Sequence, residues 1–408
     1  MKIESRRNPS LRRSRGERVY VGMSGGVDSS LSAALLVEAG HDVTGVYMKN
    51  WTADLPGMKC PWAEDLADAK RVAVQLGIQF KVFDFQDQYK HLVVDYMIAE
   101  YSAGRTPNPD IMCNQEVKFK LFLDAALADG ADAIATGHYA RAQRNIFSSS
   151  TCSQKCHTLD GQQNRPEGRT CLCRQEYTFL THKSGDDSEK SRTTARLLRA
   201  RDLNKDQTYF LYRVTAEALS KTIFPLGDFT SKAEVREEAE KRELTTARKR
   251  DSQGICFVGN VGIREFLSQF VETKLGAIVE RETDKTIGQH DGAIFYTFGQ
   301  RHGLSVGGGL PYYVVGKDMT KNEVYVSTNL NSENFWRHEI YLTDIHWINE
   351  APSSNQTYQI RVRHRAPLVD AAIDGDVVRL SNPERAVAPG QSIVIYDDEI
   401  VMGGGIVQ

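Results

Sequence analysis

The first third of the chain alternates short apolar runs with longer segments whose apolar residues recur at helical spacing. Strands are expected at 18–22, 41–48, 79–85 and 131–136, and helices at 29–39, 63–76, 89–102 and 118–127. Alternating strands and helices predict an α/β fold with a doubly wound parallel sheet. In such folds the ligand site lies at the carboxyl ends of the strands.

The pattern changes twice after this region. Between about 143 and 196 apolar residues are scarce among Ser, Thr, Gln, Asn, Arg, Gly and Asp, which is typical of a disordered surface insertion. Helical spacing resumes at 205–220 and 231–242. From about 276, short β-rich runs at 294–298, 312–316, 323–327, 358–363 and 392–396 are broken by turn residues and predict a small C-terminal β-barrel.

A chain of 408 residues exceeds the usual size of a single hydrophobic core, so several domains are expected. We divide it into a basic tail (1–17), a first domain that carries the insertion (18–215), a small central domain (216–285) and the C-terminal β-barrel domain (286–408).

Charge and composition restrict the partners. Lys and Arg number 51 against 53 Asp and Glu, so there is no global basic field, and any RNA contact must be a local patch. No apolar run approaches the length of a membrane span and no secretory signal is visible, so we expect a soluble protein without a membrane partner. The tail, with six arginines and one lysine among residues 1–18, partly fits a mitochondrial presequence and equally fits a frayed basic terminus.

The clearest candidate site is the glycine loop Ser24-Gly25-Gly26-Val27-Asp28-Ser29-Ser30 between the first expected strand and helix. Its backbone N–H groups and the positive helix end suit a phosphate, and the serines add hydroxyl donors. The loop lacks the lysine of a Walker motif, so no cation is evident to support attack on a terminal phosphoryl group, and Asp28 instead suits a metal bound to pyrophosphate. A plain strand-to-helix turn is the alternative. The loop resembles that of the N-type ATP pyrophosphatase superfamily, which cleaves ATP between its α and β phosphates.

Two cysteines lie in separate polar or glycine-containing segments. Cys113 follows Asp110 by three positions in a loop stiffened by two prolines, close enough for a carboxylate to manage protons beside a thiol. Cys256 follows a glycine within 251–259 and by itself suits a buried strand. Two thiols that meet in space suit sulfur transfer, with one carrying a persulfide and the other forming a disulfide with it.

Many segments in order resemble the tRNA-specific 2-thiouridylase family over nearly the whole chain. They are 22–29, 45–51, Cys60 with 64–69, 108–114, 137–141, 205–211, 224–227, 251–259 and 388–391. The resemblance implies that ATP adenylates the C2 oxygen of the wobble uridine of a tRNA and that sulfur then replaces this oxygen. It implies that Cys256 carries the persulfide, that Cys113 releases the sulfur and that Asp110 is the acid/base residue. Uridine C2=O is an unreactive, urea-like carbonyl, so activation by ATP is chemically reasonable.

The resemblance also implies cofactors, partners and contacts. ATP and Mg²⁺ are expected, with tRNAs of the Lys, Glu and Gln type and a persulfide donor, either a cysteine desulfurase or a relay protein. ATP contacts are expected at Gly22, Met23, Ser24, Gly25, Gly26, Val27, Asp28, Ser29, Met48 and Gly137. Contacts with tRNA are expected at Asn108, Pro109, Asp110, His138, Lys205, Asp206, Gln207, Arg363, His364 and Gln391. His364 replaces the aromatic residue of the family's Arg-Tyr pair, which puts stacking there in question; Arg361, Arg363 and Arg365 form a basic cluster for phosphates.

The polar insertion holds further candidate metal ligands. Cys152, Cys156, His157, Cys171, Cys173 and His182 match no common zinc-finger spacing, so a disordered loop is preferred over a metal site. Long insertions of this kind are more typical of a eukaryotic organellar enzyme than of a compact bacterial one. This favours a mitochondrial location, with a cytoplasmic one as the alternative if the chain is bacterial.

Other functions remain open. A different adenylating enzyme, such as an argininosuccinate-synthetase-like ligase or a cytidine thiolase, and a non-catalytic tRNA-binding protein are the alternatives. The cysteine pair opposes the ligase and the non-catalytic protein. A cytidine thiolase is expected to carry C-x-x-C where this chain has D-x-x-C.

Overall fold

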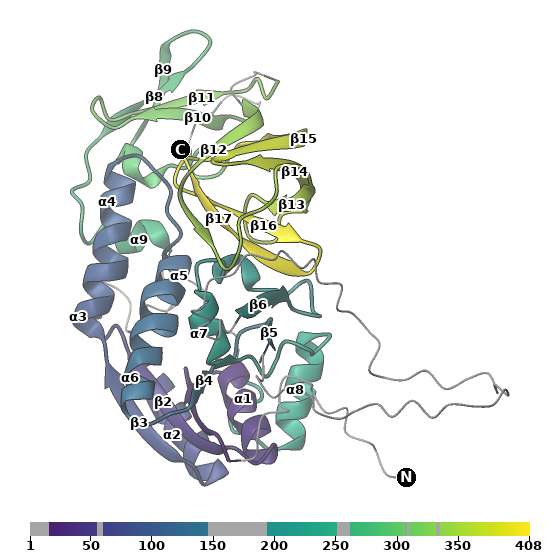
Figure 1. Cartoon of the computed structure of the whole chain (residues 1–408). Helices are drawn as coiled ribbons and strands as arrows, with labels where there is room; N and C mark the ends of the chain where they lie inside the picture. Colours follow the sequence, from purple (N-terminus) through teal and green to yellow (C-terminus); the bar gives the residue numbers. More distant parts are fainter. Residues whose placement is uncertain are drawn as a thin grey trace, which may run out of the picture.

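The computed structural model describes residues 16–54, 60–145, 194–250, 262–304, 306–307, 311–331 and 335–408. Figure 1 shows an α/β body at the amino-terminal end of the colour bar, a small sheet in green and a barrel in yellow. The polar insertion with its candidate metal ligands, and the segment that contains Cys256, lie outside the described residues.

A parallel sheet of five strands forms the centre of the α/β body. Its strands are β1 (Arg18–Gly22), β2 (Asp42–Lys49), β3 (Gln79–Asp84), β4 (Ala133–Ala135) and β7 (Thr222–Ile223). Their order is β3-β2-β1-β4-β7, and every pairing is parallel. The strand order reverses between β1 and β4, and ligands bind at such a switch point. The expected doubly wound α/β fold is confirmed.

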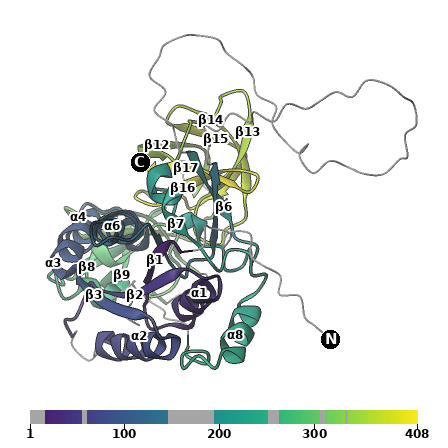
Figure 2. The same cartoon turned by 60° about the horizontal axis from the view of Figure 1, so that its bottom comes forward.

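Helices cover both faces of this sheet. Figure 2 shows α1 (Val27–Glu38), α2 (Trp62–Leu76) and α8 (Lys232–Lys241) on one side of it. The strands alternate accordingly: Val19 and Val21 of β1 belong to the core under α1, α2 and α8, whereas Tyr20 belongs to the core on the opposite face. That second face is covered by α3 (Gln86–Tyr89), η2 (Lys90–Asp95), α4 (Tyr96–Ser102), α5 (Pro109–Met112), η3 (Cys113–Leu121) and α6 (Phe122–Ala128).

Two of the expected helices differ in detail. The helix expected at 118–127 begins earlier, at Pro109, and is π-helical over Cys113–Leu121. The helix expected at 205–220 is wrong, because its first half is a turn with the 3-10 helix η4 (Thr208–Phe210), and α7 (Ala216–Ser220) starts anew at its N-cap Thr215. None of the helices in the described ranges combines the length and hydropathy needed to cross a membrane.

The small sheet in green contains four strands. They are β8 (Gly276–Glu280), β9 (Lys285–His290), β10 (Tyr313–Asp318) and β11 (Glu323–Ser327), in the order β10-β11-β8-β9, preceded by α9 (Ile263–Leu267). The strand expected at 294–298 is instead the 3-10 helix η5 (Ala293–Phe295), which follows Gly292 at φ 150°.

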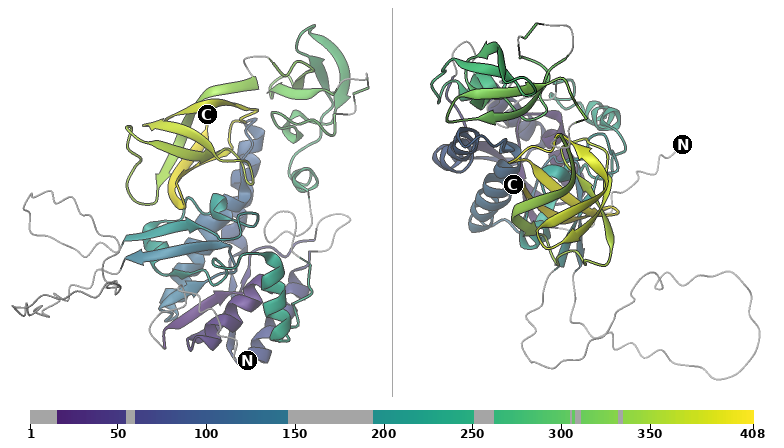
Figure 3. Two further views of the ribbon diagram at one scale, coloured as in Figure 1. Left: turned by 90° about the vertical axis from the view of Figure 1, so that its right-hand side faces the viewer. Right: turned by 90° about the horizontal axis from the view of Figure 1, so that it is seen from above.

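The barrel is closed by its own strands. These are β12 (Trp336–Trp347), β13 (Thr357–Arg361), β14 (Val369–Asp374), β15 (Val377–Arg385), β16 (Ser392–Asp397) and β17 (Ile400–Val407). They pair in the order β12-β15-β14-β13-β16-β17, and β17 pairs back with β12. The expected C-terminal β-barrel is confirmed (Figure 3).

Two strands of the α/β body extend the barrel sheet. β5 (Ala140–Asn145) and β6 (Thr194–Arg199) flank the insertion and form a hairpin, and Leu198 of β6 pairs with Ile400 of β17. After β4 the chain therefore leaves the parallel sheet, adds β5 and β6 to the barrel sheet, and returns through α7 to β7. The outer residues of the expected insertion, 143–145 and 194–196, belong to these strands rather than to a loop.

Strand pairing places the domain divisions elsewhere than expected. The division at 215/216 would separate β7 and α8 from the body whose sheet and core they complete. The division at 285/286 would cut the β8–β9 hairpin, whose Glu280 pairs with Lys285. A paired hairpin is one structural unit, so the sheet topology instead separates the small sheet from the barrel between β11 and β12.

Candidate nucleotide site and base pocket

The glycine loop lies at the switch point of the parallel sheet. Met23 N–H donates to the carbonyl of Val46 at 2.8 Å, which holds the loop to β2. Gly25 has φ 74°, and a Cβ atom at this residue would lie 2.3 Å from the carbonyl oxygen of Asp65 in α2. Only glycine therefore fits this close, left-handed turn.

The end of α1 that faces the loop has no side-chain cap. Its N-cap is Gly26, which makes no side-chain hydrogen bond, and the hydroxyl of Ser29 instead accepts from Ser24 N–H at 3.1 Å. A helix N-terminus of this kind favours an anion such as a phosphate. The loop after β4 closes the site, because a Cβ atom on Gly137 would lie 2.8 Å from Ser29 N.

A lysine from a distant segment lies beside the loop. Lys232 Nζ, at the start of α8, contacts both carboxylate oxygens of Asp28 at 2.7 and 2.8 Å, and Tyr139 OH donates to the same carboxylate at 2.8 Å. The loop itself lacks a Walker lysine, as expected from the sequence, but a cation from about 200 residues further along the chain lies beside it. A lysine in the first turn of a helix is disfavoured by the helix dipole, and this was the signal in the sequence.

Asp28 is also the candidate ligand for a metal ion at this site. Among the described residues there is no group of three or more His, Cys, Asp or Glu side chains that could hold an ion. Mg²⁺ does not need such a cage, because one carboxylate together with substrate phosphates is a usual ligand set. Asp28 would fit that role, and its carboxylate is paired with Lys232 in this structure.

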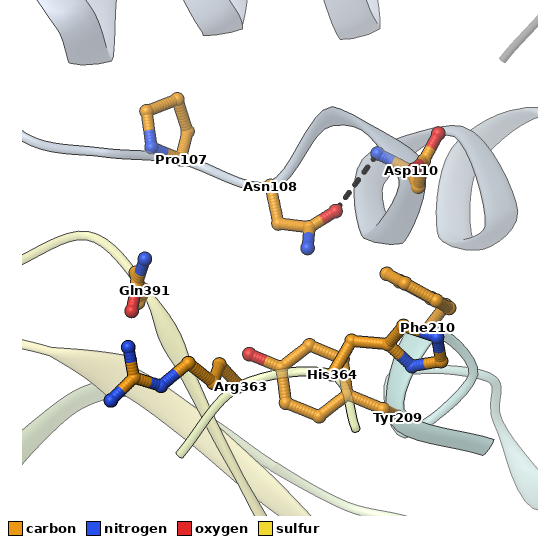
Figure 4. Close-up of a pocket in the computed structure, with 8 residues that line it drawn as sticks. All are labelled: Pro107, Asn108, Asp110, Tyr209, Phe210, Arg363, His364 and Gln391. Atoms are coloured by element: carbon orange, nitrogen blue, oxygen red, sulfur yellow. Dashed lines mark hydrogen bonds between the residues drawn. The ribbon is translucent and has the colours of Figure 1, made fainter. Parts of the chain in front are cut away.

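A second site opens where the α/β body meets the barrel. Its volume is about 350 Å³, and Figure 4 shows residues of four separate segments facing one another across it. The lining residues are Pro107, Asn108, Asp110, Tyr209, Phe210, Arg363, His364 and Gln391. A second contact fixes this junction, since Thr106 N–H donates to the carbonyl of Pro389 at 2.8 Å.

Asn108 organises the wall on the side of the α/β body. Its side-chain oxygen accepts from the N–H groups of Asp110 and Ile111 at 3.1 and 3.3 Å, so it caps α5 and orients Asp110 at the pocket. Cys113 follows one turn later and is completely buried, with an exposed fraction of 0%. The thiol thus lies behind the pocket wall rather than in it.

The opposite wall is aromatic. The rings of Phe210 and His364 have centroids 4.5 Å apart at an interplanar angle of 41°. Burial, followed by the nearby charges of Arg365 and Arg361, lowers the pKa of His364 to about 4, so the ring is neutral at physiological pH. His364 therefore keeps the ring contact with Phe210 that an aromatic residue would make at this position.

A buried carboxylate supports this wall from behind. Asp206 accepts from Thr208 Oγ1 at 2.8 Å and from Arg361 NH1 at 3.2 Å, and Arg199 lies at 3.7 Å. Its side chain has an exposed fraction of 0%. Both oxygens of Asp206 therefore serve the protein, and the side chain positions η4, which carries Tyr209 and Phe210. The expected contact of Asp206 with tRNA stays a prediction.

Comparison with known proteins agrees with this architecture. Residues 17–165 and 172–260 match the family model "tRNA methyl transferase HUP domain", 264–328 match "tRNA methyl transferase PRC-barrel domain" and 337–407 match "Aminomethyltransferase beta-barrel domain". The chain is 41% identical over 400 residues to the tRNA-specific 2-thiouridylase MnmA of Streptococcus sanguinis, covering 96% of this chain and 95% of that protein. This chain belongs to the tRNA-specific 2-thiouridylase family.

Further members of the 2-thiouridylase family match equally completely. The MnmA proteins of Bacillus velezensis and Pseudomonas fluorescens are 41% and 40% identical over 398 and 412 residues, covering 96% and 98% of this chain and 94% and 97% of the two proteins.

The structure brings together only part of the contact set that the 2-thiouridylase resemblance implied. Asn108, Asp110, Arg363, His364 and Gln391 line one pocket, whereas Pro109 lies buried beneath it. Met48 is buried with 5% exposure and packs close to Gly22. Cys256 and the candidate metal ligands of the insertion lie outside the described residues.

His138, Lys205 and Gln207 do not line the base pocket. His138 packs between Phe119 and Phe224, and burial together with the charge of Lys118 holds its pKa well below the usual range. Because Lys118 only donates, His138 Nε2 accepts from it at 3.5 Å and Nδ1–H donates to Thr136. Gln207 exchanges hydrogen bonds with the backbone of Tyr139, and the Lys205 N–H donates to Asp202.

Tyr209 and Phe210 were missed as individual site residues. They lie in the segment 205–211 that carries the resemblance, yet their spacing there is equally typical of core residues. The available signal was Asp206, because an Asp side chain often accepts from the backbone N–H two residues on and so forms a turn, as it does here from Thr208 N–H at 3.3 Å.

Proposed function

We propose that this chain is a tRNA-uridine 2-sulfurtransferase that uses ATP to replace the C2 oxygen of the wobble uridine with sulfur. The observation that carries the proposal is the base pocket, which presents Asp110 and an aromatic wall at the junction of the α/β body with the barrel. Its volume of about 350 Å³ suits a single extruded nucleobase. The 2-thiouridylase relatives, matched over 95% and 94% of their length, favour uridine as that base.

In the first step ATP activates the uridine. The C2 oxygen attacks the α phosphorus, pyrophosphate leaves, and the base carries an O–AMP group. The N–H groups at the start of α1 and the Lys232 ammonium stabilise the leaving pyrophosphate, whose charge they complement. Mg²⁺, held by Asp28 and the phosphates, would add further charge neutralisation. Asp110 takes the proton from uridine N3 that would otherwise oppose attack by the oxygen.

In the second step sulfur replaces the activated oxygen. A persulfide on Cys256 is the carrier, and the Cys113 thiolate attacks its inner sulfur. The terminal sulfur bonds to C2, the C2–O bond breaks, and AMP leaves with the oxygen. A disulfide between Cys113 and Cys256 remains, so a dithiol must supply two electrons before the next turnover. A cysteine desulfurase or a relay protein supplies the persulfide.

Binding of the tRNA is local rather than global. Arg363 is exposed at the rim of the pocket, and its neighbour Arg365 is also exposed. With a net charge of -2 on the whole chain, such a patch is where phosphates of an anticodon loop are expected to dock. The tRNAs for Lys, Glu and Gln are the proposed substrates.

Thiolation of tRNA by the purified full-length chain tests the proposal. Unmodified tRNA, ATP, Mg²⁺, a persulfide donor and dithiothreitol should yield 2-thiouridine at the wobble position, detected by mass spectrometry of nucleosides. Cys256→Ser and Cys113→Ser should abolish the product because each removes one sulfur of the exchange, whereas Cys173→Ser in the insertion should not.

The same assay separates the alternatives. Product that persists in Cys256→Ser would remove the assigned sulfur carrier. A methylated nucleoside formed with S-adenosylmethionine in place of ATP and persulfide would replace thiolation with methyl transfer, which the names of two matching family models mention.

A further inference from the structure

Asn50 carries an unexplained buried amide. The residue directly follows β2 and is 1% exposed. Neither its side-chain oxygen nor its side-chain nitrogen has a hydrogen-bond partner among the described residues. A carboxamide can donate two hydrogen bonds and accept two, and none of the four is made to a residue that the structure describes.

An unused buried amide is costly. Each unsatisfied polar atom in the interior destabilises the folded chain, so such groups are rare and need an explanation. A leucine has nearly the same shape and would avoid the penalty. The amide is therefore expected to serve a ligand that supplies its missing partners.

The position of Asn50 points to the nucleotide. β2 runs beside β1, with Val46 opposite Gly22, and the backbone of Val46 also holds Met23 of the glycine loop. Asn50 stands at the carboxyl end of the strand, where ligands of a doubly wound sheet bind.

Alternation along β2 places Asn50 on the face of Met48. Met48 belongs to the core shared with Cys113, whereas Tyr47 belongs to the core under α1 and α2. A Cβ atom on Gly22 would lie 3.0 Å from Met48 Cε, so this face of β2 borders the start of the loop. Asn50 thus continues the row of side chains that begins beside the loop.

A carboxamide is complementary to one edge of adenine. Its oxygen accepts from the 6-amino group while its nitrogen donates to N7, the bidentate pairing by which Asn and Gln read adenine in nucleic acids. The phosphates belong to the loop and the helix end, which leaves a neutral donor–acceptor pair for the base. We propose that Asn50 binds the 6-amino edge of the adenine of ATP and makes the site selective for it; this rests on the proposed use of ATP.

The amino end of the same strand provides a matched control. His41 directly precedes β2, is 7% exposed, and has no partner for either ring nitrogen among the residues that the structure describes. Like Asn50, it is a buried polar side chain without hydrogen-bond partners among the described residues. It lies, however, at the end of the sheet opposite to the ligand site. Removing its polar atoms should relieve the same penalty without affecting the nucleotide.

The test compares Asn50→Leu with His41→Phe in the full-length chain. Both changes should raise the melting temperature. Binding is then measured by calorimetry for ATP and for purine riboside triphosphate, which lacks the 6-amino group. The wild type should bind ATP roughly tenfold more tightly than the analogue, because the hydrogen bond from the 6-amino group to the amide oxygen is lost while the bond to N7 remains. Asn50→Leu should bind both nucleotides equally weakly, and His41→Phe should keep the wild-type preference.

Several results would overturn the assignment. If Asn50→Leu retains the preference for ATP over the analogue, the adenine edge is read elsewhere. If the change raises KM for tRNA and leaves ATP binding intact, the amide belongs to the uridine. Failure of the wild type to bind ATP at all would contradict the proposed function itself, which separates the two failures. Asn50→Gln, which keeps the amide but moves it by one methylene, should fall between wild type and Asn50→Leu.

Discussion

The nucleotide loop and the base pocket are built in different ways. The loop is a run of consecutive residues between β1 and α1, and its shape depends on backbone contacts such as that of Gly25 with the carbonyl of Asp65. The pocket exists only where residues 107–110, 209–210, 363–364 and 391 meet, and it depends on side chains. Its aromatic wall is held by the buried charges of Asp206 and Arg361.

This difference in construction determines which substitutions each site tolerates. A backbone site is sensitive to added volume and insensitive to charge, because its contacts leave no room for a side chain. A side-chain site supported by buried charges is sensitive to loss of charge, because each unpaired ion in the interior is strongly destabilising. Three substitutions test this contrast.

The largest effect is expected for Asp206→Asn. The change keeps the shape but leaves Arg361 and Arg199 without their shared carboxylate in a buried environment. We expect a loss of about 3 kcal/mol in the free energy of unfolding, measured by urea denaturation, together with a raised KM for tRNA.

Asp202→Asn is the matched control for that change. Asp202 is also buried, at 6% exposure, but it accepts from the N–H groups of Asn204 and Lys205, which an amide oxygen can still do. Equal losses of unfolding free energy in Asp206→Asn and Asp202→Asn would show that the charge of Asp206 does not support the pocket. The contrast between a backbone site and a site supported by buried charge would then fail.

Gly25→Ala is expected to have the next largest effect. The added methyl group would overlap the Asp65 carbonyl at 2.3 Å and displace the loop. A misplacement of about 1 Å lowers activity roughly a hundredfold, so we expect such a loss in kcat/KM for ATP. Gly40→Ala is the control, since Gly40 has a similar φ of 85° but no atom within 4 Å of a Cβ; equal losses would mean that backbone strain alone is responsible.

The smallest effect is a pH dependence at the aromatic wall. The pKa of His364 is about 4 in the folded chain, below its ordinary value of 6.5. The unfolded chain therefore binds more protons between these values, and stability is lost as pH falls from 6.5 toward 4. Replacing His364 with Tyr removes this titration and should preserve about 1 kcal/mol at pH 5 after allowance for partial exposure.

Urea midpoints at pH 7.5 and pH 5 measure this difference. His338→Tyr, at an exposed position on β12, should leave the pH dependence of the wild type unchanged. An acid sensitivity that is the same in wild type and His364→Tyr would mean that the ring is not held neutral by the pocket.

Local patterns in the sequence predicted the sheet and the loop. The strands expected at 18–22, 358–363 and 392–396 are confirmed because their apolar residues and turn signals are adjacent in the chain. The runs at 312–316 and 323–327 are also strands, but they belong to the small sheet and not to the barrel in which they were expected. Asp110 and the residues of the loop were found because they lie in short, contiguous motifs. The roles of Cys256, the tRNA set, the sulfur donor and a mitochondrial location stay predictions.

Contacts between distant segments could not be predicted in this way. Lys232 reaches Asp28 across 204 positions, and Arg361 reaches Asp206 across 155. The contact of Asp206 with tRNA was expected from the resemblance alone, and no local pattern indicates that two arginines lie against its buried carboxylate. Strand β5 reads as polar for the same reason: its partners are fixed only by the folded barrel.

The pairing of the β5–β6 hairpin with the barrel can form only late in the synthesis of the chain. Leu198 of β6 pairs with Ile400 of β17, so the ribosome adds roughly 200 residues after β6 before the partner strand β17 exists. At 5–20 residues per second this takes about 10–40 s. During that interval the strand presents an unpaired edge next to the insertion, which makes the nascent chain a candidate client for chaperones. The same interlock means that the barrel, cut out at residue 335, would lack the two strands that extend its sheet.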